Sequence, residues 1–181
     1  GRSWRGRDPL KFVTELEMLR DRHGVAVAML SDETPTTDPV RWEKVLDLLV
    51  ERQSGLELLM ETRVDDILRD EPILAKYAKA GVSHVYLGVE STSQATLDLY
   101  KKDIKVTESK RAIDLINEYG MVSETSFVLG TPEETTASVR ETVELAKWYA
   151  PDMAFFLAIT PWPYADLWDE LKDHVATTDY R

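Results

Sequence analysis

Hydrophobic and polar positions follow two periods along this chain, one typical of helices and one typical of buried strands. Behind an Asp8-Pro9 start, apolar side chains recur on one helical face, and Asp38-Pro39 opens a second helix that ends near Gly55. A short apolar run follows each helix. The pattern predicts helices at residues 8–23, 38–55, 72–80, 93–100, 107–119 and 134–149, a last helix that begins near Ala165, and strands at residues 25–30, 56–60, 82–89, 122–129 and 153–159.

This strict alternation predicts an α/β fold with parallel strands joined by crossover helices. We expect a partial (βα) TIM-like barrel with about five parallel strands and flanking helices; an open doubly wound sheet is the alternative. No glycine-rich phosphate turn follows the first strand, which weakens a dinucleotide-binding version of that alternative. A complete barrel needs about 250 residues. We therefore expect residues 1–181 to form one truncated domain, whose missing first strand lies upstream.

The amino-acid composition argues against several classes of function. Acidic residues outnumber basic ones by 33 to 22, for a net charge of −11, which disfavours binding to nucleic acid. No apolar run approaches the roughly 20 residues that a membrane span needs, so we expect a cytoplasmic protein with no membrane span. The chain has no cysteine, and its three histidines are far apart in sequence. We expect no metal site formed by this chain alone and three unrelated histidines.

Polar residues gather where the predicted strands end, which is where parallel βα folds bind ligands. Taken one at a time, the polar residues at each strand end are explained by helix capping, because acids and threonines cap the following helix. Carboxylates at three ends, an arginine at another and two proline-rich corners favour a site for a zwitterionic, hydroxyl-rich small molecule. The five ends read SDETP at 31–35, ETR at 61–63, GVES at 88–91, GTPEET at 130–135 and TPWP at 160–163.

Three of these segments resemble those of the radical S-adenosylmethionine superfamily. FVLGTPEET at 127–135 is similar to its FxxGxPGET corner, YLGVES at 86–91 to its strand ending in a ribose-binding acid, and TRVD at 62–65 also has a counterpart. The resemblance implies S-adenosylmethionine as cofactor. It also implies a four-iron four-sulfur cluster on a CxxxCxxC loop, absent here, and a 5′-deoxyadenosyl radical.

LSDETPTTDPVRW at 30–42 and TPWPYADLW at 160–168 resemble the cobalamin-binding branch, in particular the anaerobic oxidative cyclases of magnesium-protoporphyrin IX monomethyl ester. GRSWRGRDP at 1–9 resembles the segment just after the cysteine loop. The resemblance implies a parent enzyme that forms the isocyclic ring of chlorophyll-type tetrapyrroles, with a cobalamin domain upstream, and predicts that this chain alone is inactive. The alternatives are another cobalamin-dependent radical enzyme, such as a methyltransferase, and a non-catalytic, nucleoside-binding barrel remnant.

The resemblance also implies site residues. Asp32 and Glu33 match acids that accept hydrogen bonds from the methionine ammonium group. Arg63 would bind the methionine carboxylate, although a structural pairing with a neighbouring aspartate is equally favoured. Glu90 matches the acid that binds the ribose hydroxyls, with helix capping as the alternative.

On the fourth predicted strand, Ser126, Val128 and Gly130 share one face with Glu124 and would contact the cofactor. Ser126 stands where the family has glycine, and so does Glu133, which leaves the shape of that turn open. Thr160 would also contact the cofactor. Trp162 and Pro163 would contact the substrate, with Trp162 stacking on a flat macrocycle; a purely structural corner is equally favoured. Glu134 is expected to cap its own helix.

The same reasoning predicts partners. The parent enzyme would take a small porphyrin-type substrate and a reductant protein. An incomplete barrel also leaves two sheet edges unpaired, which favours self-association of the chain.

Overall fold

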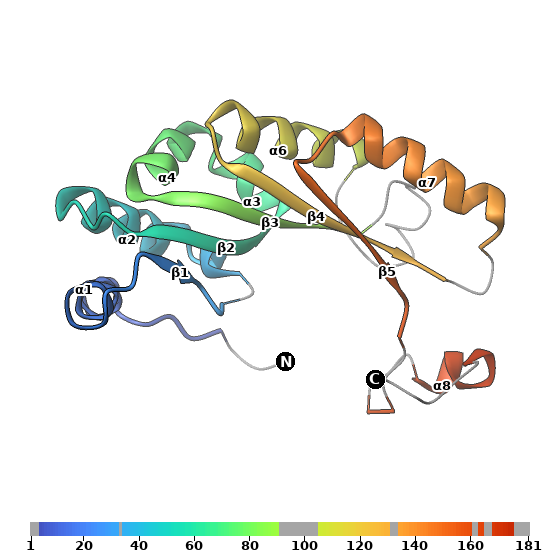
Figure 1. Ribbon diagram of the computed structural model, residues 1–181, viewed down its shortest axis with the longest axis horizontal. Helices are drawn as coiled ribbons and strands as arrows, with labels where there is room; N and C mark the ends of the chain where they lie inside the picture. Colours follow the sequence, from blue (N-terminus) through green and yellow to red (C-terminus); the bar gives the residue numbers. More distant parts are fainter. Residues whose placement is uncertain are drawn as a thin grey trace.

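The computed structural model describes residues 4–32, 34–90, 105–130, 134–160, 163–164 and 168–175. Helices and strands alternate along the described chain (Figure 1). In order, the elements are α1 (Pro9–His23), β1 (Val27–Met29), η1 (Pro35–Thr37), α2 (Pro39–Glu51), β2 (Glu57–Arg63), α3 (Val64–Arg69), η2 (Glu71–Ile73), α4 (Leu74–Ala80), β3 (Val82–Glu90), α6 (Val106–Glu118), β4 (Val122–Leu129), α7 (Thr136–Tyr149), β5 (Met153–Ala158), α8 (Trp168–Leu171) and η3 (Lys172–His174).

The first two long helices begin as their sequence predicts. Asp8 accepts a hydrogen bond from the backbone N–H of Lys11 at 2.9 Å, and Asp38 accepts one from that of Arg41 at 3.0 Å. In both helices proline takes the first position, where its missing N–H is not needed. The acid–proline pairs therefore fix where α1 and α2 start.

The five strands form one parallel sheet in the order β1-β2-β3-β4-β5. Each strand pairs with the next one along the chain, and Figure 1 shows helices α2, α3, α4, α6 and α7 along one face of the curled sheet. A doubly wound sheet would reverse its strand order and place helices on both faces. The prediction of a partial TIM-like barrel is therefore confirmed, and the doubly wound alternative is wrong.

The core lies between the sheet and these helices. Alternate residues of β2, β3 and β4 point into it, among them Leu58, Val85 and Phe127, each with no exposed surface. On the helix side, α2 contributes a stripe at helical spacing. The ring of Phe127 stacks between those of Tyr149 on α7 and Phe156 on β5. The fully or almost fully buried residues of α2 are Trp42, Val45, Leu46 and Leu49.

Four local features differ from the predictions. Strand β1 is shorter than residues 25–30, and β2 runs on through Arg63 because residues 61–63 pair with β3 despite being polar. Helix α3 follows β2 directly and was not predicted, since six residues are too few for a periodic signal. Helix α7 is capped by Thr135, so the prediction that Glu134 caps it was wrong. The predicted helix at 93–100 and Ala165 lie outside the described residues.

Gly81 lets α4 return into β3 where the backbone passes close to β2. Its φ is +97°, and a Cβ there would lie 2.1 Å from the carbonyl oxygen of Leu56. Gly24, which ends α1, has a φ of +66°, but a Cβ there would have no neighbouring atom within 4 Å. At Gly81 both the backbone conformation and a close contact oppose a side chain, whereas at Gly24 only the backbone conformation does.

We expect Gly81→Ala to lower the free energy of unfolding by more than about 2 kcal/mol, because both the left-handed backbone and the Leu56 carbonyl oppose a Cβ. Gly24→Ala is the matched control and should lower it by only about 1 kcal/mol. Urea denaturation of both variants measures the two values. Equal losses would show that the close approach to Leu56 does not constrain this turn.

Candidate functional site

The carboxyl ends of the five strands meet at one rim of the sheet, because the strands are parallel and adjacent. Asp32 follows β1, Arg63 ends β2 and Glu90 ends β3; Gly130 and Thr160 follow β4 and β5. The structure therefore brings these predicted site residues to the same edge. Their roles as ligands stay predictions.

On the β1 and β2 side of the rim, Asp32 is exposed, and Glu33 lies outside the described residues. Arg63 donates a hydrogen bond from Nε to Asp65 at 2.9 Å, and both side chains are about half exposed, at 57% and 49%. The structural pairing of Arg63 is thus present. Its exposure leaves the outer guanidinium nitrogens open to solvent.

On the β3 and β4 side, the backbone of Glu90 pairs with Phe127, and its side chain lies outside the description. Ser126 is buried, and its Oγ shares a 2.5 Å hydrogen bond with the Tyr86 hydroxyl. Val128, two residues further along the same face, is half-buried. Ser126 therefore binds a ligand only if its hydrogen bond to Tyr86 is broken. Val128 offers an apolar surface without any such change.

The last part of the rim comprises the turns after β4 and β5. Gly130 has a φ of +96°, and its backbone N–H donates to the Glu134 carboxylate, so Glu134 closes this turn. The hydroxyl of Thr160 donates to the carbonyl oxygen of Ala158 at 3.1 Å. Of the two predicted substrate residues, Pro163 is exposed and Trp162 lies outside the described residues.

Below the rim, a buried polar network ties the loop after β1 to β2 and α3. The Thr36 hydroxyl donates to Asp66 at 2.5 Å and shares a 2.6 Å hydrogen bond with the Thr62 hydroxyl. Arg69 donates to the same Asp66 carboxylate at 2.6 Å and to the backbone carbonyl of Thr36 at 3.1 Å. Thr36, Thr62 and Asp66 are all buried. This network holds the segment that carries Asp32 against β2.

The network continues to α4 through Asp70. Asp70 accepts two hydrogen bonds from Arg69, at 2.7 and 2.8 Å, and one from the Tyr77 hydroxyl at 2.6 Å. The hydrogen bonds to Asp70 raise the pKa of Arg69. Burial, and then the Asp70 carboxylate, raise the pKa of the Tyr77 hydroxyl well above its ordinary value. Arg69 is therefore permanently charged and Tyr77 neutral, which suits a structural role.

The concave face of the sheet, opposite the helices, carries a second polar cluster. His84 Nε2 is hydrogen-bonded to the Glu124 carboxylate, next to the Tyr86–Ser126 bond. Both pairs reach across from β3 to β4. The His84 and Glu124 side chains are each about one-fifth exposed. The prediction of unrelated histidines did not include this pair. The available signal was that His84 and Tyr86 on β3, and Glu124 and Ser126 on β4, are polar residues two positions apart.

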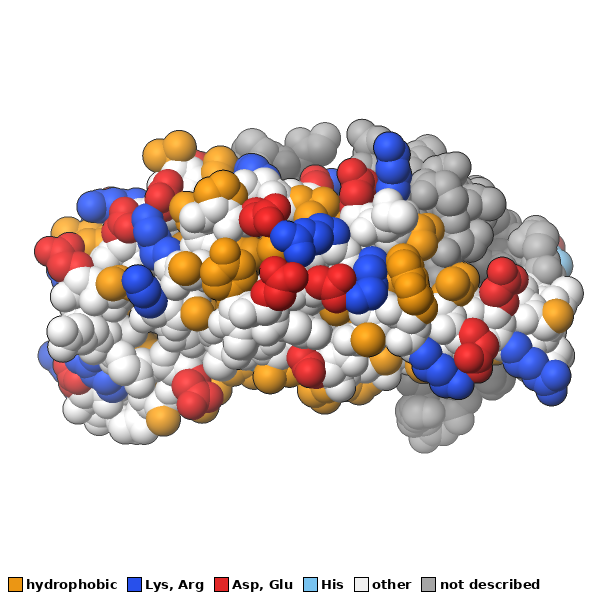
Figure 2. Space-filling model, turned by 90° about the horizontal axis from the view of Figure 1, so that it is seen from above, with side chains coloured by type: hydrophobic (Ala, Val, Ile, Leu, Met, Phe, Trp, Pro, Cys, Tyr) orange, Lys and Arg blue, Asp and Glu red, His pale blue; other side chains and the backbone are white. Residues whose placement is uncertain are grey.

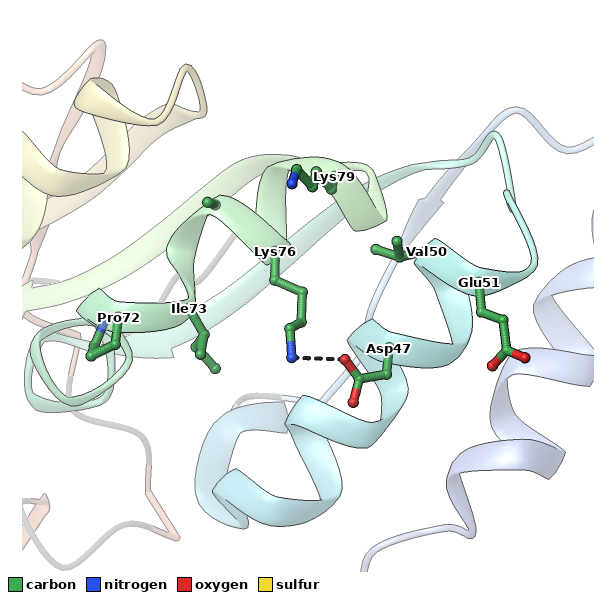
Figure 3. Close-up of a pocket in the computed structure, with 8 residues that line it drawn as sticks. Asp47, Val50, Glu51, Pro72, Ile73, Lys76 and Lys79 are labelled. Carbon is green, nitrogen blue, oxygen red and sulfur yellow. Dashed lines mark ion pairs between the residues drawn. The ribbon is translucent and has the colours of Figure 1, made fainter.

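The outer face of the molecule, formed by the helices, carries charged side chains of both signs (Figure 2). Figure 2 shows acidic and basic side chains next to one another over the helices. Between α2 and α4 lies a groove of about 550 Å³, lined partly by Val50, Pro72 and Ile73 (Figure 3). Its Lys76 is already paired with Glu43 and Asp47, both at 2.7 Å. The groove lies between helices and not at the strand ends, and Lys76 in its lining is already neutralised, so the rim and concave face remain the candidate site.

The described part of the chain lacks two features, a metal-binding cluster and a membrane-spanning helix. No cluster of three or more His, Cys, Asp or Glu side chains is arranged to hold a metal ion. None of the described helices is long and apolar enough to cross a membrane.

Comparison with known proteins identifies the family. The model of the radical SAM superfamily matches residues 1–146. The chain belongs to the radical SAM superfamily. Its curled parallel sheet agrees with that membership: the structure superposes with a TM-score of 0.80 on the radical S-adenosylmethionine methyltransferase TsrM of Kitasatospora setae, solved with cobalamin and a four-iron four-sulfur cluster bound. That superposition covers 93% of this chain and 34% of TsrM at 19% identity, and so shows the shared fold.

Two curated relatives are more similar in sequence. The anaerobic magnesium-protoporphyrin IX monomethyl ester cyclase of Rubrivivax gelatinosus is 40% identical over 99% of this chain and 32% of its own length. The protein of the same name from Cereibacter sphaeroides is 37% identical over 99% of this chain and 30% of its own length. The chain thus spans about a third of the curated relatives that it matches.

We expect Asp66→Ala to lower the free energy of unfolding by about 3–5 kcal/mol, because it removes the carboxylate that accepts hydrogen bonds from Arg69 and from the buried Thr36 hydroxyl. The matched control is Asp65→Ala on the same helix, which removes only an exposed ion pair and should cost less than about 1 kcal/mol. Chemical denaturation distinguishes the two. Similar small losses in both variants would contradict a structural role for the buried network.

Proposed function

We propose that this chain is part of the core barrel of a radical SAM oxidative cyclase that acts on magnesium-protoporphyrin IX monomethyl ester. The observation that supports this most directly is the 40% and 37% identity, over nearly the whole chain, to two cyclases of that name. The geometry is compatible with it. Five parallel strands present one polar rim, where βα folds bind small molecules.

In this proposal, the rim binds S-adenosylmethionine. Asp32, with Glu33, accepts hydrogen bonds from the methionine ammonium group, and the exposed Arg63 binds the carboxylate with the nitrogens that Asp65 leaves open. Glu90 accepts hydrogen bonds from the ribose. The remaining proposed contacts, on the adenine side, are Ser126, Val128, Gly130 and Thr160.

The described residues fit this cofactor in part. Asp32 is an exposed acceptor at the end of β1, and Val128 is a half-buried apolar surface suited to a flat base. The chain has no cysteine, so its own residues do not fit a thiolate-held iron–sulfur cluster, and we propose that such ligands lie outside it. When bound, S-adenosylmethionine and the cluster supply the radical that abstracts hydrogen. Cobalamin is proposed only for a part of the parent enzyme outside this chain.

For the substrate, we propose a porphyrin-type macrocycle contacted by Trp162 and Pro163 beyond β5. We place the parent enzyme in the cytoplasm and assign it a reductant protein as electron donor. The second candidate function is a cobalamin-dependent methyltransferase. It is favoured by the TM-score of 0.80 to TsrM, itself a methyltransferase, but the higher sequence identities are to cyclases. A non-catalytic, nucleoside-binding remnant is the remaining alternative.

We expect the chain to bind S-adenosylmethionine and Asp32→Asn to weaken that binding about tenfold, because a charge-assisted hydrogen bond to the ammonium group is lost. Asp21→Asn is the matched control, since Asp21 is an exposed acid on α1, away from the rim. Isothermal titration calorimetry measures the affinities. Absence of binding by the wild-type chain, or equal affinity in the Asp32 variant, would contradict the proposed cofactor site.

We also propose that the chain self-associates through its open sheet edges. All six residues of β5 are exposed, none is charged, and the described structure pairs β5 with β4 only. We expect the light-scattering mass to rise with concentration, and Leu157→Lys, which puts a charge on the edge, to reduce that rise. A mass that stays monomeric at high concentration would refute this proposal.

A further inference from the structure

Arg41 stands in the first turn of α2, at the β1 end of the rim. Helices that follow parallel strands begin on the side where the strands end, and α2 follows the loop that carries Asp32. Figure 1 shows the amino-terminal segment before α1 on the open side of the curled sheet, below β1. The Arg41 side chain joins this segment to both helices. It contacts the rings of Trp4 and Phe12, and its Nε donates to the carbonyl oxygen of Arg7 at 2.6 Å.

These contacts fix the plane and direction of the guanidinium group. Its central carbon lies 5.8 Å from the ring centroid of Trp4 and 5.8 Å from that of Phe12, within the range of cation–π attraction. Among the described residues, Nε alone of the three guanidinium nitrogens has a hydrogen-bond partner. The two terminal nitrogens of Arg41 therefore present a fork of N–H groups that is already oriented, as bidentate binding of a carboxylate requires.

No acid in the described part of the chain neutralises this arginine. Arg7, by contrast, is paired with Glu15. Asp38 accepts a hydrogen bond from the backbone N–H of Arg41 as a helix cap and forms no ion pair with its guanidinium group. Asp8 caps α1 in the same way. The partly buried guanidinium group of Arg41 is therefore available to an external anion.

Trp4 gives the same place an apolar surface. Its side chain is 45% exposed, although Arg41 lies against the indole ring. Gly6 makes this position of the ring possible, because a Cβ on Gly6 would lie 2.5 Å from Cη2 of Trp4 and 2.7 Å from Cδ of Arg41. A ligand with an anionic group and a flat apolar body thus finds a partner for each part, the fork of Arg41 and the exposed indole.

We propose that Arg41 binds a carboxylate of the substrate and that Trp4 contacts the flat ring to which this carboxylate is attached. The ligand class is a tetrapyrrole with a free carboxylate, and this identity rests on the proposed function. A monomethyl ester of protoporphyrin IX has the required chemistry, because one of its two propionate groups is esterified and the other is free. Binding at the β1 end of the rim holds the macrocycle next to Asp32, where the cofactor is proposed to bind.

The test titrates the chain with protoporphyrin IX monomethyl ester and, separately, with the dimethyl ester, which lacks the free carboxylate; porphyrin fluorescence measures both affinities. We expect the wild-type chain to bind the dimethyl ester about tenfold more weakly, because a charge-assisted bidentate contact is lost. Arg41→Gln should bind both esters with the affinity that the wild type has for the dimethyl ester. Misfolding does not produce this pattern, because it would weaken the binding of both esters.

The ring contact is tested with a second variant. Trp4→Ala should weaken the binding of both esters about threefold to tenfold, because an aromatic contact does not depend on the carboxylate. Trp148→Ala is the matched control, since Trp148 on α7 is 49% exposed. Arg22→Gln is the control for loss of a positive charge, since Arg22 is an exposed arginine near the end of α1. Both control variants should bind the two esters as the wild type does.

S-adenosylmethionine is the other source of a carboxylate. Arg41→Gln should bind it with the affinity of the wild type, and a tenfold loss there would assign Arg41 to the cofactor and overturn the proposed substrate contact. Equal affinity of the wild type for the two esters, an equal loss for both esters in Arg41→Gln, or no binding of either ester would also overturn it. The Asp32→Asn titration uses S-adenosylmethionine alone, so the proposed cofactor site and this proposal fail separately.

Discussion

The alternation of side chains along β2, β3 and β4 divides the sheet into two chemically different faces, and the remaining structure depends on this division. One set of alternate residues, including Leu58, Val85 and Phe127, is buried beneath the helices. The other set points to the concave side and includes His84 and Glu124. Burial of the first set stabilises the fold, so the second set is free to carry polar chemistry. A shift of one residue in register would exchange the two sets, which is why the register is strongly specified.

The buried network around Asp66 shows how the rim is held in place. The rim loops have few apolar residues of their own, and the loop after β1 is attached instead through the Thr36 hydroxyl and backbone carbonyl. A charged group is costly to bury, but Asp66 is compensated by hydrogen bonds from Arg69 and from the Thr36 hydroxyl. The same arginine also donates to Asp70, which accepts a hydrogen bond from Tyr77, so one guanidinium connects the loop to α3 and, through Asp70, to α4. The position of Asp32 therefore depends on residues that are buried below the rim.

The sequence predicted most of the fold because each element carries its own signal. Asp8-Pro9 and Asp38-Pro39 mark helix starts, and apolar runs mark buried strands, so the strand ends and the rim residues followed directly. What could not be predicted depends on pairing between distant residues. Helix α3 is too short for a periodic signal. The His84–Glu124 pair joins residues 40 positions apart, and recognising it requires the register of β3 against β4. Arg63 remained ambiguous in the sequence because both of its possible partners are acidic; the structure shows the bond to Asp65.

The sequential strand order has a consequence for how such a chain acquires its structure. Every strand contacts only its immediate predecessor and successor, so the described sheet contains no pairing between strands distant in the chain. Pairing between consecutive strands keeps the sequence separation of the sheet contacts smaller than a reversed strand order would. During synthesis, each strand emerges when the edge that receives it already exists, and the sheet can grow by one βα unit at a time. Such growth permits units to be gained at the β5 edge during evolution without rearranging those already formed.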